Sequence, residues 1–262
     1  MKNRHVVNLL RALLLVSVFL VWDSLVRFGW ASKFFFGEPL LVLRQVVKWF
    51  VTGEIYPHLL TTLLETILAF SGGALFGLGI GLWLALNPTA AKLFDPYVKA
   101  LSSMPRVILA PIFALWFGLG IWSKVALGIT LVFFVVFFNV YQGVKEVSPV
   151  VLANARMLGA NSRQLLRTVY LPSATSWVFS SLHTSVGMAF VGVVVGEYLG
   201  SARGVGYLIL QAEGVFDINA VFAGILVLTV FALILDALVS LLEKSVYGWR
   251  ASTAAVTTTE AT

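Results

Sequence analysis

Three ionisable side chains, Glu65, His183 and Glu197, lie inside strongly apolar stretches of the sequence. An ionisable group at membrane depth is costly unless it faces the protein interior, so each is a candidate for the pathway or gate of a transporter. Carboxylates repel an anionic solute unless they are paired or protonated, which favours gating over solute binding for the two glutamates. The alternative is that all three only form hydrogen bonds within a helix bundle.

A second group of candidate residues lies in the basic loop 143–172. Ser148 and Pro149 can begin a helix that Gly159 can end. A second helix can begin at Asn161, with Gln164 three residues later as in a capping box. The loop therefore predicts a helix-turn-helix outside the membrane.

The first loop helix carries an apolar surface that a plain connector would not need. Small Ala153 and Ala155 stand beside apolar Leu152 and Leu158. Such a surface is suited to a groove on a soluble partner, and Arg156 could add a charged contact. The simpler interpretation is a solvated connector whose basic residues touch lipid headgroups.

Catalytic and metal-binding chemistry find little support in the sequence. It contains no cysteine, and its three histidines, His5, His58 and His183, are far apart. It has no His-Glu-x-x-His motif, no Ser-His pair at membrane depth and no Gly-x-x-x-x-Gly-Lys-Ser/Thr phosphate loop. We therefore expect no enzyme, no metal site and no cofactor bound by this chain.

The elements that must position these residues are membrane-spanning helices. Of the 262 residues, 59% are hydrophobic and only 11% are charged, far below the charged fraction of soluble domains. The fold class is therefore all-α, a polytopic membrane protein with a single domain over residues 1–250 and a disordered Thr-rich tail over 251–262. Six spans are expected, at about residues 9–28, 59–86, 101–118, 121–141, 173–199 and 219–242.

The distribution of basic residues predicts the orientation. Placing the N-terminus inside puts two thirds of the 18 Lys and Arg on the cytoplasmic side. Both termini and the loop 143–172 are then cytoplasmic. The net charge of +6 is thus explained by loops that face anionic lipid, and no nucleic-acid partner is expected.

Two spans carry glycines at four-residue spacing, which makes a smooth stripe on each helix. Such stripes allow close helix packing, either within the subunit or against a moving neighbour or a dimer partner. The stripes consist of Gly73, Gly77, Gly81, Gly192, Gly196 and Gly200.

The loop resembles the motif of a known family, the membrane subunits of bacterial ATP-binding-cassette (ABC) importers. The family pattern is Glu-Ala-Ala, three residues, Gly, nine residues, Ile, one residue, Leu-Pro. This chain has Ala153-Asn154-Ala155, then Gly159, then Val169-Tyr170-Leu171-Pro172 at the same spacing. The leading acid and the first alanine of the motif are replaced here, so any contact made by the family's glutamate is absent or moved.

The resemblance extends to two further segments and narrows the branch. Residues 111–120 and the segments 196–200 and 204–209 are similar to the taurine, aliphatic sulfonate, nitrate and bicarbonate permeases. The resemblance implies a small, anionic solute, although heterocyclic vitamin precursors remain open. It also implies coupling through Ala153, Ala155, Arg156, Gly159, Val169, Leu171 and Pro172.

The resemblance further implies partners that this chain does not contain. Two cytoplasmic ATPase subunits would bind ATP and Mg²⁺ and dock on the loop, and an extracytoplasmic binding protein would deliver the solute. A second permease subunit, which we expect to be an identical copy, would complete the pathway in the bacterial cytoplasmic (inner) membrane. The main alternative is an ion-gradient-driven secondary transporter, which would predict repeated halves with broken helices.

Overall fold

The computed structural model describes residues 2–173, 177 and 182–259, and this part of the chain is helical almost throughout, without a strand. The side chains of 2–5, 8, 12, 182, 183 and 242–259 lie outside the described part. The elements are α1 (Lys2–Arg27), α2 (Lys33–Phe36), α3 (Pro39–Thr52), α4 (Ile55–Leu86), α5 (Pro88–Ser103), η1 (Arg106–Leu109), α6 (Ala110–Phe117), α7 (Ile121–Lys145), α8 (Pro149–Met157), α9 (Ser162–Leu165), the π-turn η2 (Leu166–Tyr170), α11 (Leu182–Leu199), α12 (Val205–Gly214) and α13 (Ile218–Thr259).

The all-α membrane fold predicted from the sequence is confirmed. Within the described residues, four helices are long and apolar enough to cross a bilayer: Leu9–Arg27 of α1, α4, α7 and Ile218–Leu241 of α13. Residues Thr184–Leu199 of α11 form a shorter apolar helix. These segments correspond to five of the six expected spans, although residues 174–176 and 178–181 of the expected fifth span lie outside the described part.

The expected span 101–118 corresponds to a broken element, not to one continuous helix. The chain instead bends by 86° between α5 and the segment formed by η1 and α6. The break falls at Met104, which is extended with ψ 134°, and Pro105. A residue before proline disfavours the α-helical conformation, and proline has no N–H to continue the ladder, so the helix ends here.

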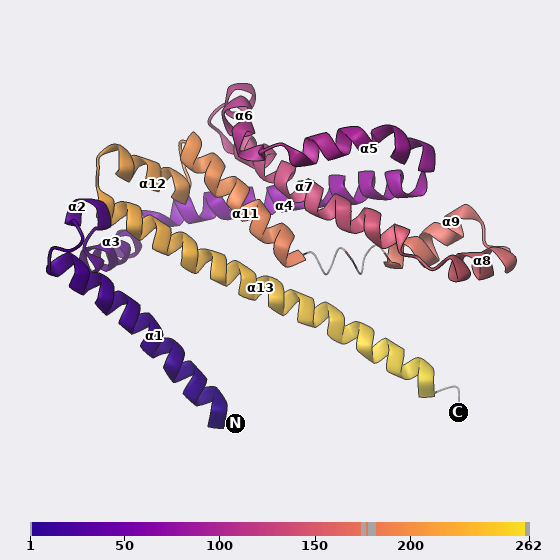
Figure 1. Cartoon of the computed structure of the whole chain (residues 1–262), viewed down its shortest axis with the longest axis horizontal. Coiled ribbons are helices and arrows are strands. Elements are labelled where there is room, and N and C mark those ends of the chain that lie inside the picture. The colour runs from indigo at the N-terminus through magenta and orange to yellow at the C-terminus, as the bar shows by residue number, and fades with distance from the viewer. Residues whose placement is uncertain (1, 174–176, 178–181, 260–262) are drawn as a thin grey trace.

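The centre of the bundle is formed by α4, α7 and α11, which lie side by side (Figure 1). Their shared core contains small and β-branched residues that allow close approach. Its buried members are Ala69, Ala85, Val132, Val136, Val140, Val144, Ala189 and Val193.

A second core gathers α3, α12 and α13 at one end of the bundle, beside the start of α4. We call this the distal end, because α8 and α9 lie at the opposite end (Figure 1). Neither α3 nor α12 was expected from the sequence, since 14 and 10 residues are too few to produce the signal of a span. Both nevertheless supply buried residues to this core, including Trp49 and Leu208.

The two terminal helices lie at the edge of the bundle (Figure 1). The first span projects away from the bundle (Figure 1), and its apolar window is only 6% buried. At its end, Trp22 packs against Phe222 of α13 and donates a hydrogen bond to the carbonyl oxygen of Phe36. The last helix extends to Thr259, and the disorder expected for the Thr-rich tail 251–262 stays a prediction.

Candidate coupling loop and distal polar network

The helix α8 begins and ends where its sequence predicts. Pro149 occupies its first position, although the Ser148 side chain makes no capping hydrogen bond. At the other end, Gly159 has φ +84°, and the N–H of Ala160 donates to the carbonyl oxygen of Ala155 at 3.0 Å. That positive φ is strained for other residues, so glycine is the natural residue to reverse the chain here.

The second loop helix is fixed by the predicted capping box. The backbone N–H of Gln164 donates to Asn161 Oδ1 at 2.9 Å, and the N–H of Asn161 donates to Gln164 Oε1 at 2.8 Å. Leu165 is buried one residue later, and Tyr170 packs against the core of α4, α7 and α11. The return arm of the loop is therefore attached to the bundle.

The motif residues of the loop divide into an exposed and a partly buried group. Ala153, Arg156, Gly159 and Pro172 are exposed, whereas the structure leaves Ala155, Val169 and Leu171 half-buried. Exposed apolar side chains stand beside Ala153, Arg156 and Gly159 in the sequence of the loop. They are Val150 (66% exposed), Val151 (49%), Met157 (80%) and Leu158 (89%). An apolar surface of this kind marks a site of interaction with another molecule.

The glycine stripe of α4 faces α7 within the same chain. A Cβ at Gly77 would lie 2.8 Å from Val136 Cβ and 2.9 Å from the carbonyl oxygen of Phe133. Gly73 meets Val132 and Gly81 meets Val140 in the same way. The structure therefore uses this stripe for packing inside the subunit.

The stripe of α11 also faces α7. A Cβ at Gly192 would lie 2.8 Å from Gly128 Cα, and one at Gly196 would lie 3.1 Å from Lys124 Cγ. Gly200 stands more loosely, 3.3 Å from Leu119 Cδ2. Because α4 and α11 both bring glycines to α7, the three helices approach closely enough to enclose polar side chains.

Glu197 is at the centre of a buried polar network at the distal end. Its Oε1 accepts a hydrogen bond from Thr62 Oγ1 at 2.6 Å, and its Oε2 accepts one from the N–H of Gly206 at 2.8 Å. The N–H of Val205 donates to Thr62 Oγ1 at 3.1 Å. Glu197 and Thr62 are both fully buried. These bonds tie the start of α12 to α4 and α11.

Glu65, one α-helical turn beyond Thr62, joins the same network. Its carboxyl group lies close enough to that of Glu197 for a hydrogen bond. It is also close enough to the Lys124 ammonium group for electrostatic attraction. The structure thus brings together two of the three ionisable residues that the sequence singled out.

His183 is not part of this network. It lies in the first turn of α11, 14 positions before Glu197, which is roughly 21 Å along a helix. Its side chain is outside the described part of the structure. The interpretation of His183 as a pathway residue stays a prediction.

Sequence reasoning missed two members of the network. Lys124 is fully buried, and its Nζ donates to the carbonyl oxygens of Leu119 at 2.6 Å and Gly120 at 2.9 Å. His58 is the second: its Nδ1 lies 3.0 Å from the carbonyl oxygen and 3.2 Å from the backbone nitrogen of Gly204, and it donates to the first or accepts from the second according to its tautomer. With the N-terminus inside, Lys124 falls on the external side at the start of its expected span, and nothing in the sequence indicates that it is buried.

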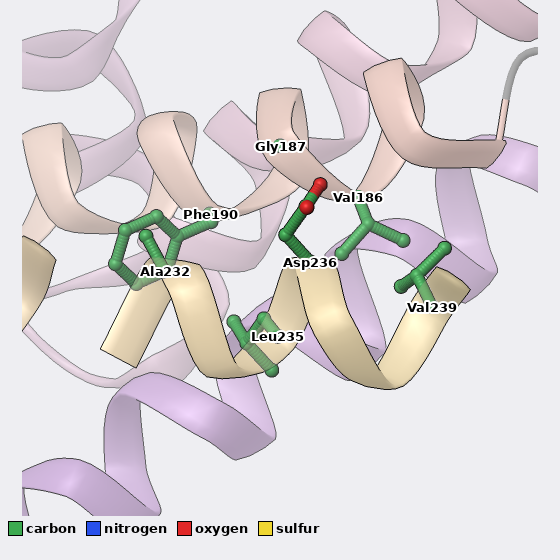
Figure 2. Close-up of a pocket in the computed structure, with 7 residues that line it drawn as sticks. All are labelled: Val186, Gly187, Phe190, Ala232, Leu235, Asp236 and Val239. Carbon is green, nitrogen blue, oxygen red and sulfur yellow. The ribbon is translucent and has the colours of Figure 1, made fainter. Parts of the chain in front are cut away.

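The sequence also gave no role to Asp236, which lies within the apolar part of α13. It lines a small cavity of about 50 Å³ between α11 and α13. Figure 2 shows its carboxylate directed toward α11, between Val186 and Gly187, with Phe190 and Leu235 nearby. An ionisable residue at this depth is a further candidate for the pathway.

Comparison with known proteins decides the family. A family model described as "Binding-protein-dependent transport system inner membrane component" matches residues 73–247. The chain belongs to this family of ABC importer permeases. In this permease the match spans the loop and the Glu197 side of the network, whereas His58, Thr62 and Glu65 precede it.

Individual relatives agree with the sulfonate and taurine branch. The permease is 32% identical to a putative aliphatic sulfonates transport permease protein, SsuC, of Bacillus subtilis, over 93% of this chain and 88% of the relative. It is 28% identical to the taurine transport system permease protein TauC of Escherichia coli, over 87% and 85% of the two chains.

A solved structure shows the same fold. Inward-facing conformations of the MetNI methionine ABC transporter match with a TM-score of 0.62 at 18% identity, over 72% of this permease and 94% of that chain.

Proposed function

We propose that this permease is the membrane-spanning subunit of an ATP-driven importer. It forms the translocation pathway for a small anionic solute of the sulfonate, taurine, nitrate or bicarbonate type. ATP hydrolysis takes place on separate cytoplasmic subunits. The permease itself is not an enzyme and binds no cofactor.

The exposed apolar end of α8 carries this proposal. Met157 and the C-cap residue Leu158 are 80% and 89% exposed at the end of a helix of only 9 residues, which is too short to span a bilayer. Burial of such side chains in a groove of a soluble protein would stabilise the complex by roughly 1.5–3 kcal/mol each. Helix-in-groove docking of an ATPase subunit uses this surface.

The loop is also connected so that a movement of α8 reaches the bundle. α7 is continuous from Ile121 to Lys145, and α8 begins four residues later at Pro149. On the return side, Tyr170 packs against the core of α4, α7 and α11. A rigid displacement of α8 by the ATPase would therefore move α7, which contacts both other central helices, as alternating access requires.

The complete importer contains partners beyond this chain. Two ATPase subunits carry ATP and Mg²⁺, and a second permease subunit, which we take to be an identical copy, completes the pathway. An extracytoplasmic binding protein delivers the solute. The complex lies in the bacterial cytoplasmic membrane, with both termini and α8 on the cytoplasmic side. The relation to SsuC and TauC supports the anionic solute.

The experiment is purification of the tagged protein from its native membrane in mild detergent, with mass spectrometry of the accompanying proteins. A cassette ATPase should co-purify with the wild type. Leu158→Asp should weaken its retention at least ~10-fold, because a charge replaces an apolar contact. Val215→Asp is the matched control, since Val215 is 75% exposed but lies at the distal end.

Two results would contradict the proposal. One is a wild-type protein without an ATPase under conditions that retain known importer complexes, which would favour an ion-gradient-driven transporter. The other is equal loss of the ATPase with Leu158→Asp and Val215→Asp, which would show that α8 is not the docking element.

A further inference from the structure

The distal network holds two carboxyl groups and one ammonium group away from water. Glu65, Lys124 and Glu197 are 1%, 0% and 0% exposed and come from α4, α7 and α11. If all three were ionised, the buried site would carry a net negative charge. A buried charge without compensation is strongly unfavourable, so the protonation of the two glutamates needs an explanation.

Glu197 has the surroundings of an ionised carboxylate. Each of its two oxygens accepts a hydrogen bond, one from the Thr62 hydroxyl and one from the N–H of Gly206. The N–H of Gly206 cannot change from donor to acceptor. Donors directed at both oxygens stabilise the charged form of a carboxyl group.

Glu65 has the opposite surroundings. Its Oε2 is buried and has no hydrogen-bond partner among the described residues, while its carboxyl lies against that of Glu197. An ionised Glu65 would place a bare oxygen in a dry site beside a second negative charge. A neutral Glu65 can instead donate its O–H to Glu197.

We propose that Glu65 and Glu197 form a proton-binding site, in which Glu65 holds the proton and Glu197 carries the charge. Lys124 then balances Glu197, and the buried network is neutral as a whole. Lys124 Nζ is held by the carbonyl oxygens of Leu119 and Gly120, and the described residues contain no group of His, Asp and Glu side chains that could hold a metal ion. The bound species is therefore a proton.

The other groups that face the network do not alter this balance. Thr62 and Thr66 are uncharged, and Thr66 donates to the carbonyl oxygen of Thr62. His58 Nδ1 is bonded to the backbone of Gly204. Glu65 and Glu197 are therefore the pair between which the proton is shared.

The hydrogen bonds of the network join the distal ends of three helices, α4, α11 and α12. Glu197 of α11 binds the first turn of α12 and Thr62 of α4, and the O–H of Glu65 adds a second link between α4 and α11. Glycine is required around this site, because a Cβ at Gly204, where φ is +109°, would overlap the Glu197 carboxyl group. The distal end thus behaves as one rigid unit. This holds whether ATP or an ion gradient drives transport.

Infrared spectroscopy of the purified full-length protein, with any subunits that accompany it, tests the site directly. A neutral carboxylic acid has a carbonyl band that is separate from the amide and carboxylate bands. The wild type at pH 7 should show this band, and Glu65→Gln should remove it. The band should persist in Glu213→Gln, whose exposed carboxylate accepts from the Tyr198 hydroxyl, and in Asp236→Asn.

Thermal unfolding separates the two glutamates independently. Gln is an isostere of a neutral Glu and can still donate to Glu197, so Glu65→Gln should leave Tm within about 2 °C of the wild type. Glu197→Gln removes the negative charge that balances Lys124, and it places an amide NH2 group against the Thr62 hydroxyl or the Gly206 N–H, which are themselves donors. Tm should therefore fall by on the order of 10 °C.

Three results would overturn the proposal. They are absence of the acid band in the wild type, its persistence in Glu65→Gln, or an equal loss of Tm in Glu65→Gln and Glu197→Gln. If Glu197→Gln does not fold, the band in the wild type and in Glu65→Gln still decides the question.

Discussion

The close contact between α4 and α7 gives a prediction that can be worked from distances. At Gly77 an added Cβ would lie 2.8 Å from Val136 Cβ, 2.9 Å from the carbonyl oxygen of Phe133 and 3.1 Å from the backbone nitrogen of Phe137. Two of these atoms are backbone and cannot rotate away, so Gly77→Ala must move α7. At Gly79, two positions later, no atom lies within 4 Å of the added Cβ.

The pair Gly77→Ala and Gly79→Ala isolates the packing contribution. Both variants gain the same helix propensity, up to about 1 kcal/mol, so it cancels in the comparison. Overpacking lowers the free energy of unfolding by about 1–3 kcal/mol, and only Gly77→Ala introduces it. At about 2–4 °C per kcal/mol for a chain of this size, Gly77→Ala should melt roughly 2–12 °C below Gly79→Ala.

The assay is thermal unfolding of both variants in the same detergent, followed by tryptophan fluorescence and by size-exclusion chromatography after heating. The two readouts separate unfolding from aggregation. If Gly77→Ala melts at or above Gly79→Ala, the glycine stripe does not face α7 and the arrangement of the central helices is wrong.

Two further predictions concern glycines with positive φ. Gly204→Ala should lower Tm by the equivalent of about 1–3 kcal/mol or more, because φ +109° is strained for alanine and the added Cβ overlaps Glu197. Gly214→Ala is the control: no atom lies within 4 Å of its added Cβ, so its Tm should stay near that of the wild type. Equal Tm values for these two variants would contradict the network geometry. Gly159→Val should uncouple ATP hydrolysis from uptake and lower Tm only by the equivalent of about 1–3 kcal/mol of backbone strain, since the space around Gly159 is open and only its φ of +84° is unfavourable for valine. Gly159→Asn, which tolerates this conformation, should retain more uptake than Gly159→Val, and normal uptake by the valine variant would count against the role of the α8 turn.

Local sequence signals predicted the elements that depend on local chemistry. The spans follow from runs of apolar residues, and the α8–α9 turn follows from Pro149, Gly159 and the pair Asn161 and Gln164, each of which acts on its own few residues. The sequence shows Pro105, but the expected span 101–118 runs across it. Hydropathy is averaged over a window of residues, so it does not report a bend within that window.

The distal network could be predicted only in part. Glu65 and Glu197 stood out because acids are rare in apolar runs. The sequence did not indicate that they meet, since that depends on how α4 and α11 pack on α7. Lys124 looked like a residue of the membrane surface, and Gly204 and Gly206 looked like ordinary turn residues. Their roles follow from the backbone path of the α11–α12 turn, which brings N–H groups to Glu197.

The most direct test of the account is transport by the complete complex in proteoliposomes. The permease, its ATPase and its binding protein are reconstituted, and uptake of labelled taurine, alkanesulfonate, nitrate, bicarbonate and a vitamin precursor is measured with and without ATP. We expect accumulation of an anionic solute that requires ATP, the binding protein and an intact Leu158. Accumulation driven by an imposed proton or sodium gradient without ATP would contradict the central claim.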